Sequence, residues 1–273
     1  MPTTLLKAPL VELIAELRWD PNVPSSAISN PAGGNVPFVT FGPTNQLEEF
    51  FMRFGAEAAR LDYPVTERLV PPGFPVLSAQ PVYRFRKQVQ GELTSLYQVG
   101  AGLFTANAVP PYQTWAQFSP VVKSGVDALL ATRSDAEKVL PFTGVSLRYI
   151  DAFGPLLTRG MNVAQFMEDV LGINIKLPDG LLAQLAPSSP HKPTLQVQLP
   201  MLGGMVMSIG VGEGTASNES AIILDTTVAT TVPVAANVDA VMSSLNLARN
   251  AIHDVFFAIT GPIKELMQPQ GVD

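Results

Sequence analysis

The sequence predicts an α+β fold in which antiparallel sheets carry long helices on one face. Strand-like segments occur in clusters and do not alternate one-for-one with helices, which argues against a doubly wound parallel sheet. Residues 194–199 alternate apolar and polar side chains, a pattern typical of an antiparallel strand with one face in water. The 273 residues divide into two halves of similar content, residues 1–152 and residues 153–273, which can also form one continuous domain.

The first periodic segment is residues 9–19. As a strand it places these side chains on one face: Val11, Leu13, Ala15, Leu17 and Trp19. A helix is the alternative, with an apolar face made by Leu10, Leu13, Ile14 and Leu17. Residues 20–43 are rich in Pro, Gly, Ser and Asn and predict a long loop, and loops of this length are usually functional or mobile. Residues 45–61 then predict a helix capped by Asn45, with an aromatic stripe that packs in the core.

Strands dominate the next part of the chain. Two runs at residues 82–87 and 93–99 predict a hairpin. Gly100 and Gly102 interrupt the pattern before a further run at residues 103–107, which predicts a bulge or a bend.

The following helix has two candidate N-caps. Thr114 and Gln117 have the spacing of a capping box, whereas Ser119 and Pro120 form a good N-cap and first-turn pair. A strand at residues 145–151 comes after this helix.

The second half opens with a short helix capped by Asn162 and stopped by Gly172. Its later elements are a turn at residues 178–185, strands at 194–199, 205–211 and 221–227, and a long helix at 238–260. Residues 210–214 resemble a phosphate-binding loop only superficially, because no Lys-Ser/Thr follows and no helix begins there. They predict a flexible strand end or turn, continued by the polar residues 215–220.

Composition restricts the function classes. Only 15% of the residues are charged, against about 25% in an average soluble domain, and 47% are hydrophobic, which excludes a disordered chain. The formal charge of −6 argues against a sequence-independent nucleic-acid binder. So few charges leave two interpretations: a monomer whose surface is polar but neutral, or, as we expect, a subunit whose apolar surface is partly covered by a second copy or a protein partner.

The sequence predicts a cytoplasmic protein without a membrane span. The apolar N-terminal segment has neither a basic leader nor a cleavage site, so it does not resemble a signal peptide. No stretch reaches about 18 uncharged apolar residues with the flanks of a transmembrane helix. The chain has no cysteine, which suits a reducing compartment and excludes thiolate catalysis and every Cys-based metal site.

Four segments resemble a sporadically distributed, uncharacterised bacterial protein family: APLVELIAELRW, LDYP, LYQVGAGLFTANAVPPYQTWAQFSP and GVSLRYIDAF. The motifs are the strand opening at Pro9 to Glu12, the Tyr-x-x-Trp-x-x-Phe element at Tyr112, Trp115 and Phe118, and the RYID strand at Arg148 to Asp151. The resemblance covers roughly the first 155 residues and, loosely, the C-terminal helix. It implies that residues 9–19 form a strand, and it implies no activity. The apolar, proline-rich loop at residues 20–43 departs from the family pattern.

The chain shows no catalytic or metal-binding constellation. His191 and His253 lie in a loop and in the last helix, without carboxylates at metal-ligand spacing, so we expect structural histidines and no metal or cofactor. No serine has the Gly-x-Ser-x-Gly context of a nucleophile elbow. The sequence therefore favours a protein that is not an enzyme, although it leaves that question open.

The candidate binding residues are Arg18, Trp19, Tyr112, Trp115, Arg148 and Asp151. Tyr112 and Trp115 follow a Pro-Pro pair; if exposed they would anchor an interface, and if buried they would form the hydrophobic entry to the next helix. Arg148 can pair with a glutamate of residues 9–19 when both strands share a sheet, which would be a structural role.

These observations favour a non-enzymatic protein-binding or assembly protein. We expect an oligomer or a complex subunit with an accessory role in defence, toxin neutralisation or a phage-related process. The alternative is a small-molecule-binding or hydrolytic protein. Its cavity would lie between the sheet and the C-terminal helix, lined by Met205, Met207 and Phe256.

Overall fold

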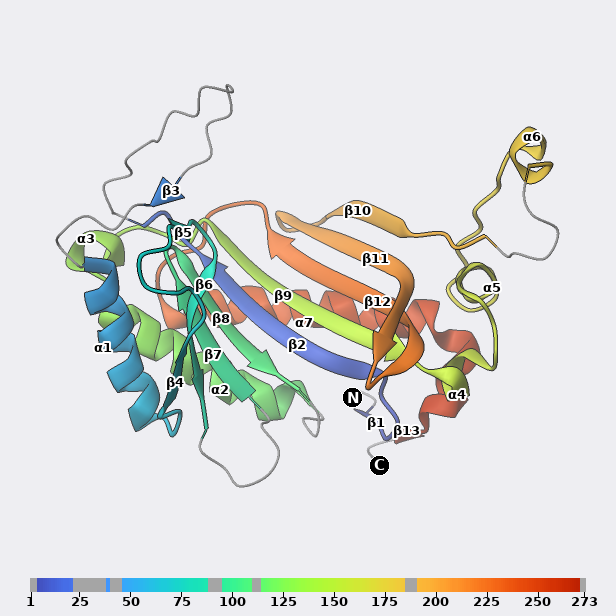
Figure 1. Cartoon of the computed structure of the whole chain (residues 1–273). Helices are drawn as coiled ribbons and strands as arrows, with labels where there is room; N and C mark the ends of the chain where they lie inside the picture. The colour runs from blue at the N-terminus through green and yellow to red at the C-terminus, as the bar shows by residue number, and fades with distance from the viewer. Residues whose placement is uncertain are drawn as a thin grey trace, which may run out of the picture. The chain divides into compact units, whose positions relative to one another are not determined.

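A nine-stranded antiparallel sheet dominates the described part of the chain (Figure 1). The structure is a computed structural model, and it describes residues 4–21, 38–39, 46–87, 95–109, 114–184 and 191–270. From one edge of the sheet to the other, the strands are β10 (Leu195–Met201), β11 (Met205–Ala216), β12 (Glu219–Thr230), β9 (Gly144–Phe153), β2 (Leu10–Arg18), β8 (Leu103–Ala108), β7 (Ser95–Gly100), β6 (Pro81–Arg86) and β4 (Val65–Arg68). The predicted α+β class is confirmed.

The remaining elements are helices and two short ribbons. In chain order the helices are α1 (Gln46–Arg60), α2 (Trp115–Thr132), α3 (Asp135–Lys138), α4 (Pro155–Thr158), α5 (Val163–Asp169), α6 (Asp179–Leu182), α7 (Val238–Ile259) and the 3-10 helix η1 (Gly261–Met267). The ribbons are β1 (Thr4–Leu5) with β13 (Pro269–Gln270), and β3 (Phe38–Val39) with β5 (Val76–Leu77). Within the described ranges, no helix combines the length and apolar character that a membrane crossing requires.

The chain forms two compact units, each built from separate segments of the sequence. The first unit contains Met1–Glu12, Arg148–Val228 and Arg249–Asp273, and the second contains Leu13–Leu147 and Ala229–Ala248. Strand β2 and helix α7 therefore each contribute residues to both units.

Residues 9–19 form a strand, and the helical alternative is wrong. Leu13, Ala15 and Leu17 are fully buried in β2, while the residues between them are only partly covered. This two-residue period is what a strand with one buried face produces.

Helix α1 packs its aromatic stripe on the sheet of the second unit, as predicted. Its Phe51 ring lies 5.2 Å from the ring of Tyr83 in β6. Its Phe54 ring lies 5.3 Å from Phe85 of β6 and 5.8 Å from Phe104 of β8. These offset and edge contacts add to the hydrophobic burial, because aromatic pairs favour such geometries.

Helix α2 begins at the first of its two predicted caps. The Thr114 hydroxyl accepts from the Gln117 amide, and the Gln117 side chain accepts from the Thr114 amide, which completes a capping box. The Ser119-Pro120 alternative is wrong, because Pro120 lies inside the helix. Further along, Gly125 lets α2 approach the sheet closely: an added Cβ atom would lie 2.5 Å from the Tyr97 ring.

Two predicted interruptions have a different structure. At Gly102 the chain does not bulge but reverses, because Gly100 pairs with Leu103 and Gly102 has a φ of +71°. The glycines of residues 210–214 do not form a loop either, since β11 continues through them to Ala216. Gly214 fits there because a Cβ atom would lie 2.5 Å from the Ile223 side chain.

The turn between β11 and β12 falls at Ser217 and Asn218, which have φ values of +51° and +63°. Two consecutive residues with positive φ are typical of a type I′ hairpin turn, and Asn tolerates that conformation. Residues 215–220 are therefore the end of one strand, a tight turn and the start of the next, and the predicted polar loop is wrong.

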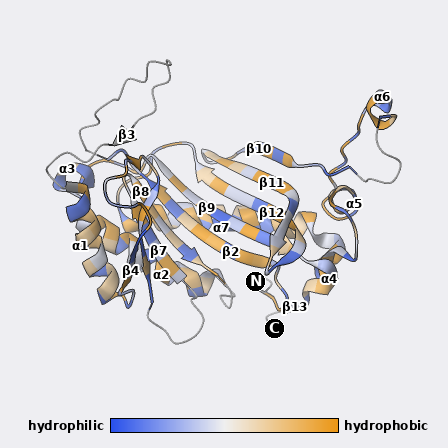
Figure 2. Ribbon diagram, viewed as in Figure 1, coloured by the Kyte–Doolittle hydropathy of each residue, from blue (hydrophilic) through white to orange (hydrophobic). Residues whose placement is uncertain are grey.

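The core of the first unit combines sheet and helix aromatics. Phe153 of β9 lies 5.0 Å from Phe166 of α5 and 6.5 Å from Phe256 of α7, measured between ring centroids. Asn162 caps α5 in a second capping box, as predicted. Figure 2 shows the alternation of apolar and polar residues along β11 and β12 as orange and pale bands.

Candidate functional site

The predicted binding residues do not converge on one site. Arg18, Trp19 and Trp115 belong to the second unit, and Arg148 and Asp151 belong to the first. Tyr112 lies outside the described residues. Each of these residues that the structure describes therefore has surroundings of its own.

Trp19 lines the larger of the two cavities described, which we call the Trp19 pocket. Its volume is about 240 Å³, and it is lined by Trp19, Leu47, Glu49, Phe50, Arg53, Gly100, Gly102, Thr132, Ser134, Ala136 and Glu137. These residues come from the end of β2, from α1, from the β7–β8 turn and from the α2–α3 region. The indole of Trp19 packs edge-on against Phe50, with 6.0 Å between ring centroids.

The polar groups of the Trp19 pocket already have partners. Trp19 donates from Nε1 to Oε1 of Glu137 at 2.9 Å. Ser134 donates to Oε2 of the same carboxylate from its backbone nitrogen at 3.1 Å and from its hydroxyl at 2.9 Å. Glu49 forms an ion pair with Arg53 one helical turn away. The pocket therefore offers a lining of mixed polar and apolar groups rather than an available acid or base.

Arg133 lies behind Trp19 and is fully buried, with 0% of its surface exposed. Its guanidinium carbon lies 5.3 Å from the centroid of the Trp19 ring and 4.9 Å from that of Phe142. Nη2 donates to the Leu140 carbonyl at 3.3 Å, whereas Nε and Nη1 have no hydrogen-bond partner. Burial lowers the pKa of Arg133 below its ordinary value, and the negative charge of Glu137 opposes this shift. The Arg133 cation is thus within cation–π distance of the Trp19 ring, and it does not itself line the pocket.

Arg18 and Trp115 have local structural partners. Arg18 is exposed and pairs with Glu16 of the same strand at 2.6 Å. Trp115 is half-buried, packs edge-on against Phe118 at 6.1 Å, and donates from Nε1 to the Asn246 side chain at 2.7 Å. Its position is that of a hydrophobic entry to α2, tied to α7 by one hydrogen bond.

Arg148 and Asp151 lie on β9 with their side chains on opposite faces, because they are three residues apart in a strand. Arg148 makes two hydrogen bonds to the Asp225 carboxylate, at 2.8 and 2.5 Å. Asp151 is buried, with 4% of its surface exposed, and burial raises its pKa to about 7. The two residues do not share a site, and the Asp225 partner of Arg148 was not predicted.

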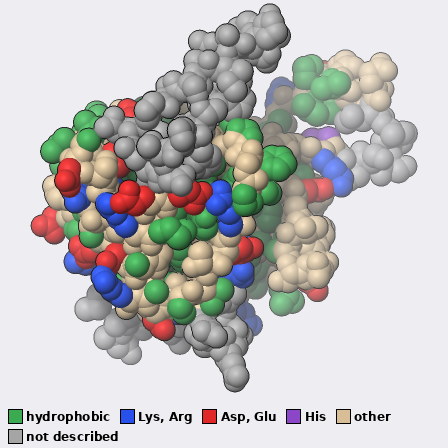
Figure 3. Space-filling model, turned by 60° about the vertical axis from the view of Figure 1, so that its left-hand side comes forward, with side chains coloured by type: hydrophobic (Ala, Val, Ile, Leu, Met, Phe, Trp, Pro, Cys, Tyr) green, Lys and Arg blue, Asp and Glu red, His purple; other side chains and the backbone are tan. Residues whose placement is uncertain are grey.

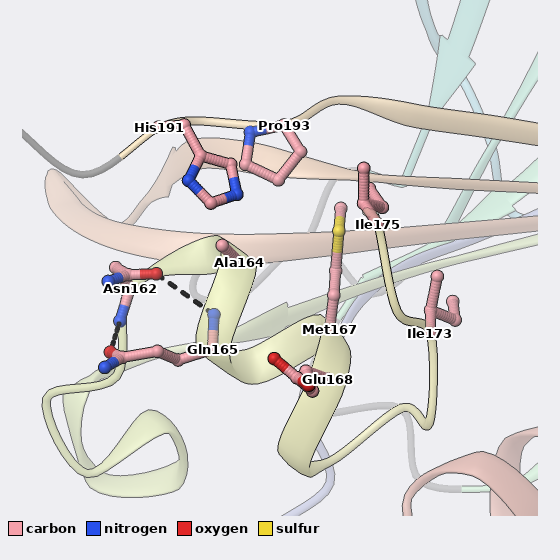
Figure 4. Close-up of a pocket in the computed structure, with 9 residues that line it drawn as sticks. All are labelled: Asn162, Ala164, Gln165, Met167, Glu168, Ile173, Ile175, His191 and Pro193. Carbon is pink, nitrogen blue, oxygen red and sulfur yellow. Dashed lines mark hydrogen bonds between the residues drawn. The ribbon is translucent and has the colours of Figure 1, made fainter. Parts of the chain in front are cut away.

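A smaller cavity of about 170 Å³ lies in the first unit (Figure 4). His191 and Pro193, which precede β10, face Met167 of α5 and the side chains of Ile173 and Ile175. At one end the side chains of Asn162 and Gln165 accept from each other's backbone nitrogens, at 3.0 and 3.1 Å, so these amides are used in helix capping. Glu168 accepts from the Asn174 side chain at 2.8 Å.

The cavity predicted between the sheet and the C-terminal helix does not coincide with either cavity described. Met207 is buried, and Phe256 stacks on Phe153; neither of these residues nor Met205 lines the two pockets. Within the residues that the structure describes, no three His, Asp or Glu side chains come together as a set of metal ligands.

Surface charges on the side of the second unit are paired rather than gathered by sign. Figure 3 shows acidic and basic side chains interspersed on this face. Glu57 pairs with Arg60 at 2.5 Å along α1, and Glu67 of β4 contacts Arg86 of β6 at 2.5 Å. This mixture offers no one-sign surface to a charged polymer.

Sequence reasoning found Trp19 but missed the residues that surround it. Glu137 and Arg133 are more than 110 positions away from Trp19 in the chain. The Ser134-x-x-Glu137 spacing is a capping box that the sequence does show, and it would have located the start of α3.

Comparison with known proteins adds no identification. No protein-family model matches the chain, and no curated protein matches its sequence.

Proposed function

We propose that this chain is a non-enzymatic protein-binding or assembly protein that receives an apolar side chain of a partner in the Trp19 pocket. The observation that carries this proposal is a cavity of about 240 Å³ with a mixed polar and apolar lining, in which the polar groups are already paired and Trp19 and Phe50 supply the aromatic part. Tryptophan is among the residue types enriched at the energetic centres of protein interfaces, and Trp19 lines this pocket with 4% of its own surface exposed.

The size of the pocket favours a side chain over a cofactor. Pockets for drug-sized ligands and cofactors enclose roughly 300–1,000 Å³. The Trp19 pocket, at about 240 Å³, lies below that range and has room for an aliphatic side chain. Its walls are rigid, because Trp19 is hydrogen-bonded to Glu137 and packed against both Phe50 and Arg133.

The state of the carboxylates supports binding over catalysis. A general acid or base needs a proton-transfer site that the substrate can reach. Glu137 accepts from Trp19 and Ser134, and Glu49 is neutralised by Arg53.

The alternative, a small-molecule-binding or hydrolytic protein, is favoured by one observation, the raised pKa of Asp151. Asp151 lines neither described cavity.

The same proposal includes the arrangement of the long helices on the sheet, the two halves of the chain and a cellular role. In it, the long helices α1, α2 and α7 cover one face of the sheet, and residues 1–152 and 153–273 act as two halves. The family resemblance and the absence of cysteine suggest an accessory role in the cytoplasm, such as defence or toxin neutralisation.

The test is to fill the pocket without disturbing the fold. Ala136 is exposed on α3 and lines the pocket, so Ala136→Trp occludes it; Ala131 is exposed on α2 outside the pocket, so Ala131→Trp is the matched control. Tagged wild-type and control chains should capture the same partner from a lysate of the source organism, and Ala136→Trp should capture at least about tenfold less. Equal capture by all three chains contradicts the proposal. So does a small molecule that native mass spectrometry finds on the wild type and not on Ala136→Trp.

A further inference from the structure

Strand β10 forms an edge of the sheet that no charged residue protects. It is seven residues long, LQVQLPM, and contains no charged residue. Gln196, Gln198 and Pro200 are exposed, and Leu199 keeps 43% of its surface exposed. Natural proteins commonly protect edge strands with charges, proline, a bulge or a covering segment, because open edges pair with other chains. Of these devices β10 has only Pro200, near its end, among its seven residues.

The opposite edge of the sheet is built differently. Strand β4 has four residues, VTER, with Glu67 and Arg68 among them. Glu67 pairs with Arg84 and Arg86 of β6, and Arg68 pairs with Glu48 of α1. Charge thus protects β4 but not β10.

The sequence of β10 is symmetric about Val197. Leu195-Gln196-Val197-Gln198-Leu199 reads the same in both directions. If two antiparallel copies pair about a two-fold axis at Val197, every side chain meets one of its own kind: Leu195 meets Leu199, Gln196 meets Gln198, and Val197 meets Val197. A two-fold interface joins the same patch on both subunits, and here the symmetric sequence makes that patch match itself residue type by residue type.

Backbone geometry is compatible with the same pairing. Pro200 has no N–H group, so in a strand paired on one side its nitrogen belongs on the unpaired edge. Gln196 and Gln198 share its parity along the strand, and their N–H and C=O groups therefore also face outward. Gln196 of each copy can then exchange two hydrogen bonds with Gln198 of the other, with the two Val197 residues as the non-hydrogen-bonded pair between them.

We infer that β10 binds β10 of a second copy of this chain, antiparallel and centred on Val197. The pairing joins two sheets into one, satisfies the outward backbone groups and covers Leu199 of each copy with Leu195 of the other. It deepens the assembly part of the proposed function by naming the partner at this edge. It does not involve the Trp19 pocket, so either can fail while the other stands.

Charge substitution at the exposed glutamines tests the pairing in the full chain. Gln196→Lys/Gln198→Lys places lysines opposite lysines, and Gln196→Glu/Gln198→Glu places glutamates opposite glutamates, so each variant alone should be a monomer. Mixed together, each lysine meets a glutamate, and the mixture should form a one-to-one dimer. Light scattering coupled to size exclusion measures the masses, and the wild type should show twice the 29.2 kDa of one chain. Leu202→Lys, at a turn residue that is 99% exposed, adds charge beside the strand and should leave the dimer intact.

Four results overturn the inference: a monomeric wild type at all concentrations, a dimer that survives the lysine pair, a mixture that does not associate, or a dimer lost in Leu202→Lys.

Disulfide cross-linking is a second, direct measurement, because the chain has no cysteine of its own. Val197→Cys should form a covalent dimer with an added mild oxidant, since non-hydrogen-bonded pairs bring Cα atoms to about 4.5 Å, within disulfide range. Leu202→Cys should not; equal cross-linking of both variants also contradicts the pairing.

Discussion

Asp151 is a carboxyl group held in the apolar interior of the first unit. Only 4% of its surface is exposed, and burial alone raises its pKa to about 7 from an ordinary value of 3.8. The native state therefore keeps its proton up to about pH 7, while the unfolded state releases it near pH 4. Between these values the folded protein binds more protons, so rising pH favours unfolding.

Asp151→Asn should remove this pH dependence, because the amide keeps the shape and does not ionise. The difference in unfolding free energy, wild type minus variant, should fall by up to about 4 kcal/mol between pH 4 and pH 7 and then stay constant. Urea unfolding at pH 4, 5.5, 7 and 8.5 measures it. Parallel pH profiles for the two proteins would show that Asp151 is already ionised in the native state.

Trp19 and Arg133 show how far residue-level prediction extends. Trp19 ends a strand whose alternation assigns its buried face, so its place was predictable. Arg133 follows the last residue of α2, and an arginine in the last turn of a helix ordinarily reaches solvent. Only the tertiary fold brings the neighbouring Trp19 and Phe142 rings to its guanidinium group, so its burial could not be predicted from its sequence neighbours.

At the scale of elements, helix α2 depends on one residue without a side chain. Gly125 faces the sheet, and an added Cβ atom would lie 2.5 Å from the Tyr97 ring and 2.7 Å from the Phe104 ring. Both rings are buried, so neither can move away without disturbing its own contacts. Helix propensity favours Ala over Gly, but the clash opposes it.

Gly125→Ala should therefore destabilise the protein by about 1–3 kcal/mol despite the better helix former. Gly180→Ala is the matched change in α6, where no atom lies within 4 Å of the added Cβ. It should leave the unfolding free energy unchanged or raise it by up to about 1 kcal/mol. Chemical denaturation compares the two; similar effects from both would mean that the α2 contact relaxes freely.

Capping boxes and hydrophobic periods gave most element positions correctly. The starts of α2 and α5 follow from Thr114 and Asn162, because caps are local interactions, whereas Asn45, the predicted cap of α1, lies outside the described residues. Glycines were misjudged, since the same residue type serves a turn at Gly102 and a crowded strand at Gly214. Whether a glycine forms a turn or a crowded strand position depends on side chains of another strand. The residue pattern of one strand does not show which side chains those are.

At the scale of the whole molecule, the low charge of the chain remains its defining property. Charged residues make up 15% of the sequence, and large apolar side chains are exposed at separate places: Leu156, Leu181, Leu199, Leu202 and Val139. Scattered apolar residues are normal on a monomer surface. The uncharged edge strand β10 is a continuous feature, and for this reason it carries more weight than composition.

Association of two copies would link stability to concentration. In the proposed dimer, only the folded chain binds a second copy. The thermal midpoint of the wild type should therefore rise as protein concentration increases from about 1 to 100 μM. The Gln196→Lys/Gln198→Lys variant should keep one midpoint across that range. Differential scanning fluorimetry measures both; a concentration-independent midpoint for the wild type would contradict association through any surface.

The charged strand β4 determines how far such a sheet can grow. In the proposed dimer, pairing at Val197 would use the uncharged edge of each nine-stranded sheet and leave an ion-paired edge at both outer ends. Because those ends carry paired charges, growth of the proposed assembly would stop at two chains. An arrangement that would otherwise propagate into fibres is thereby made finite.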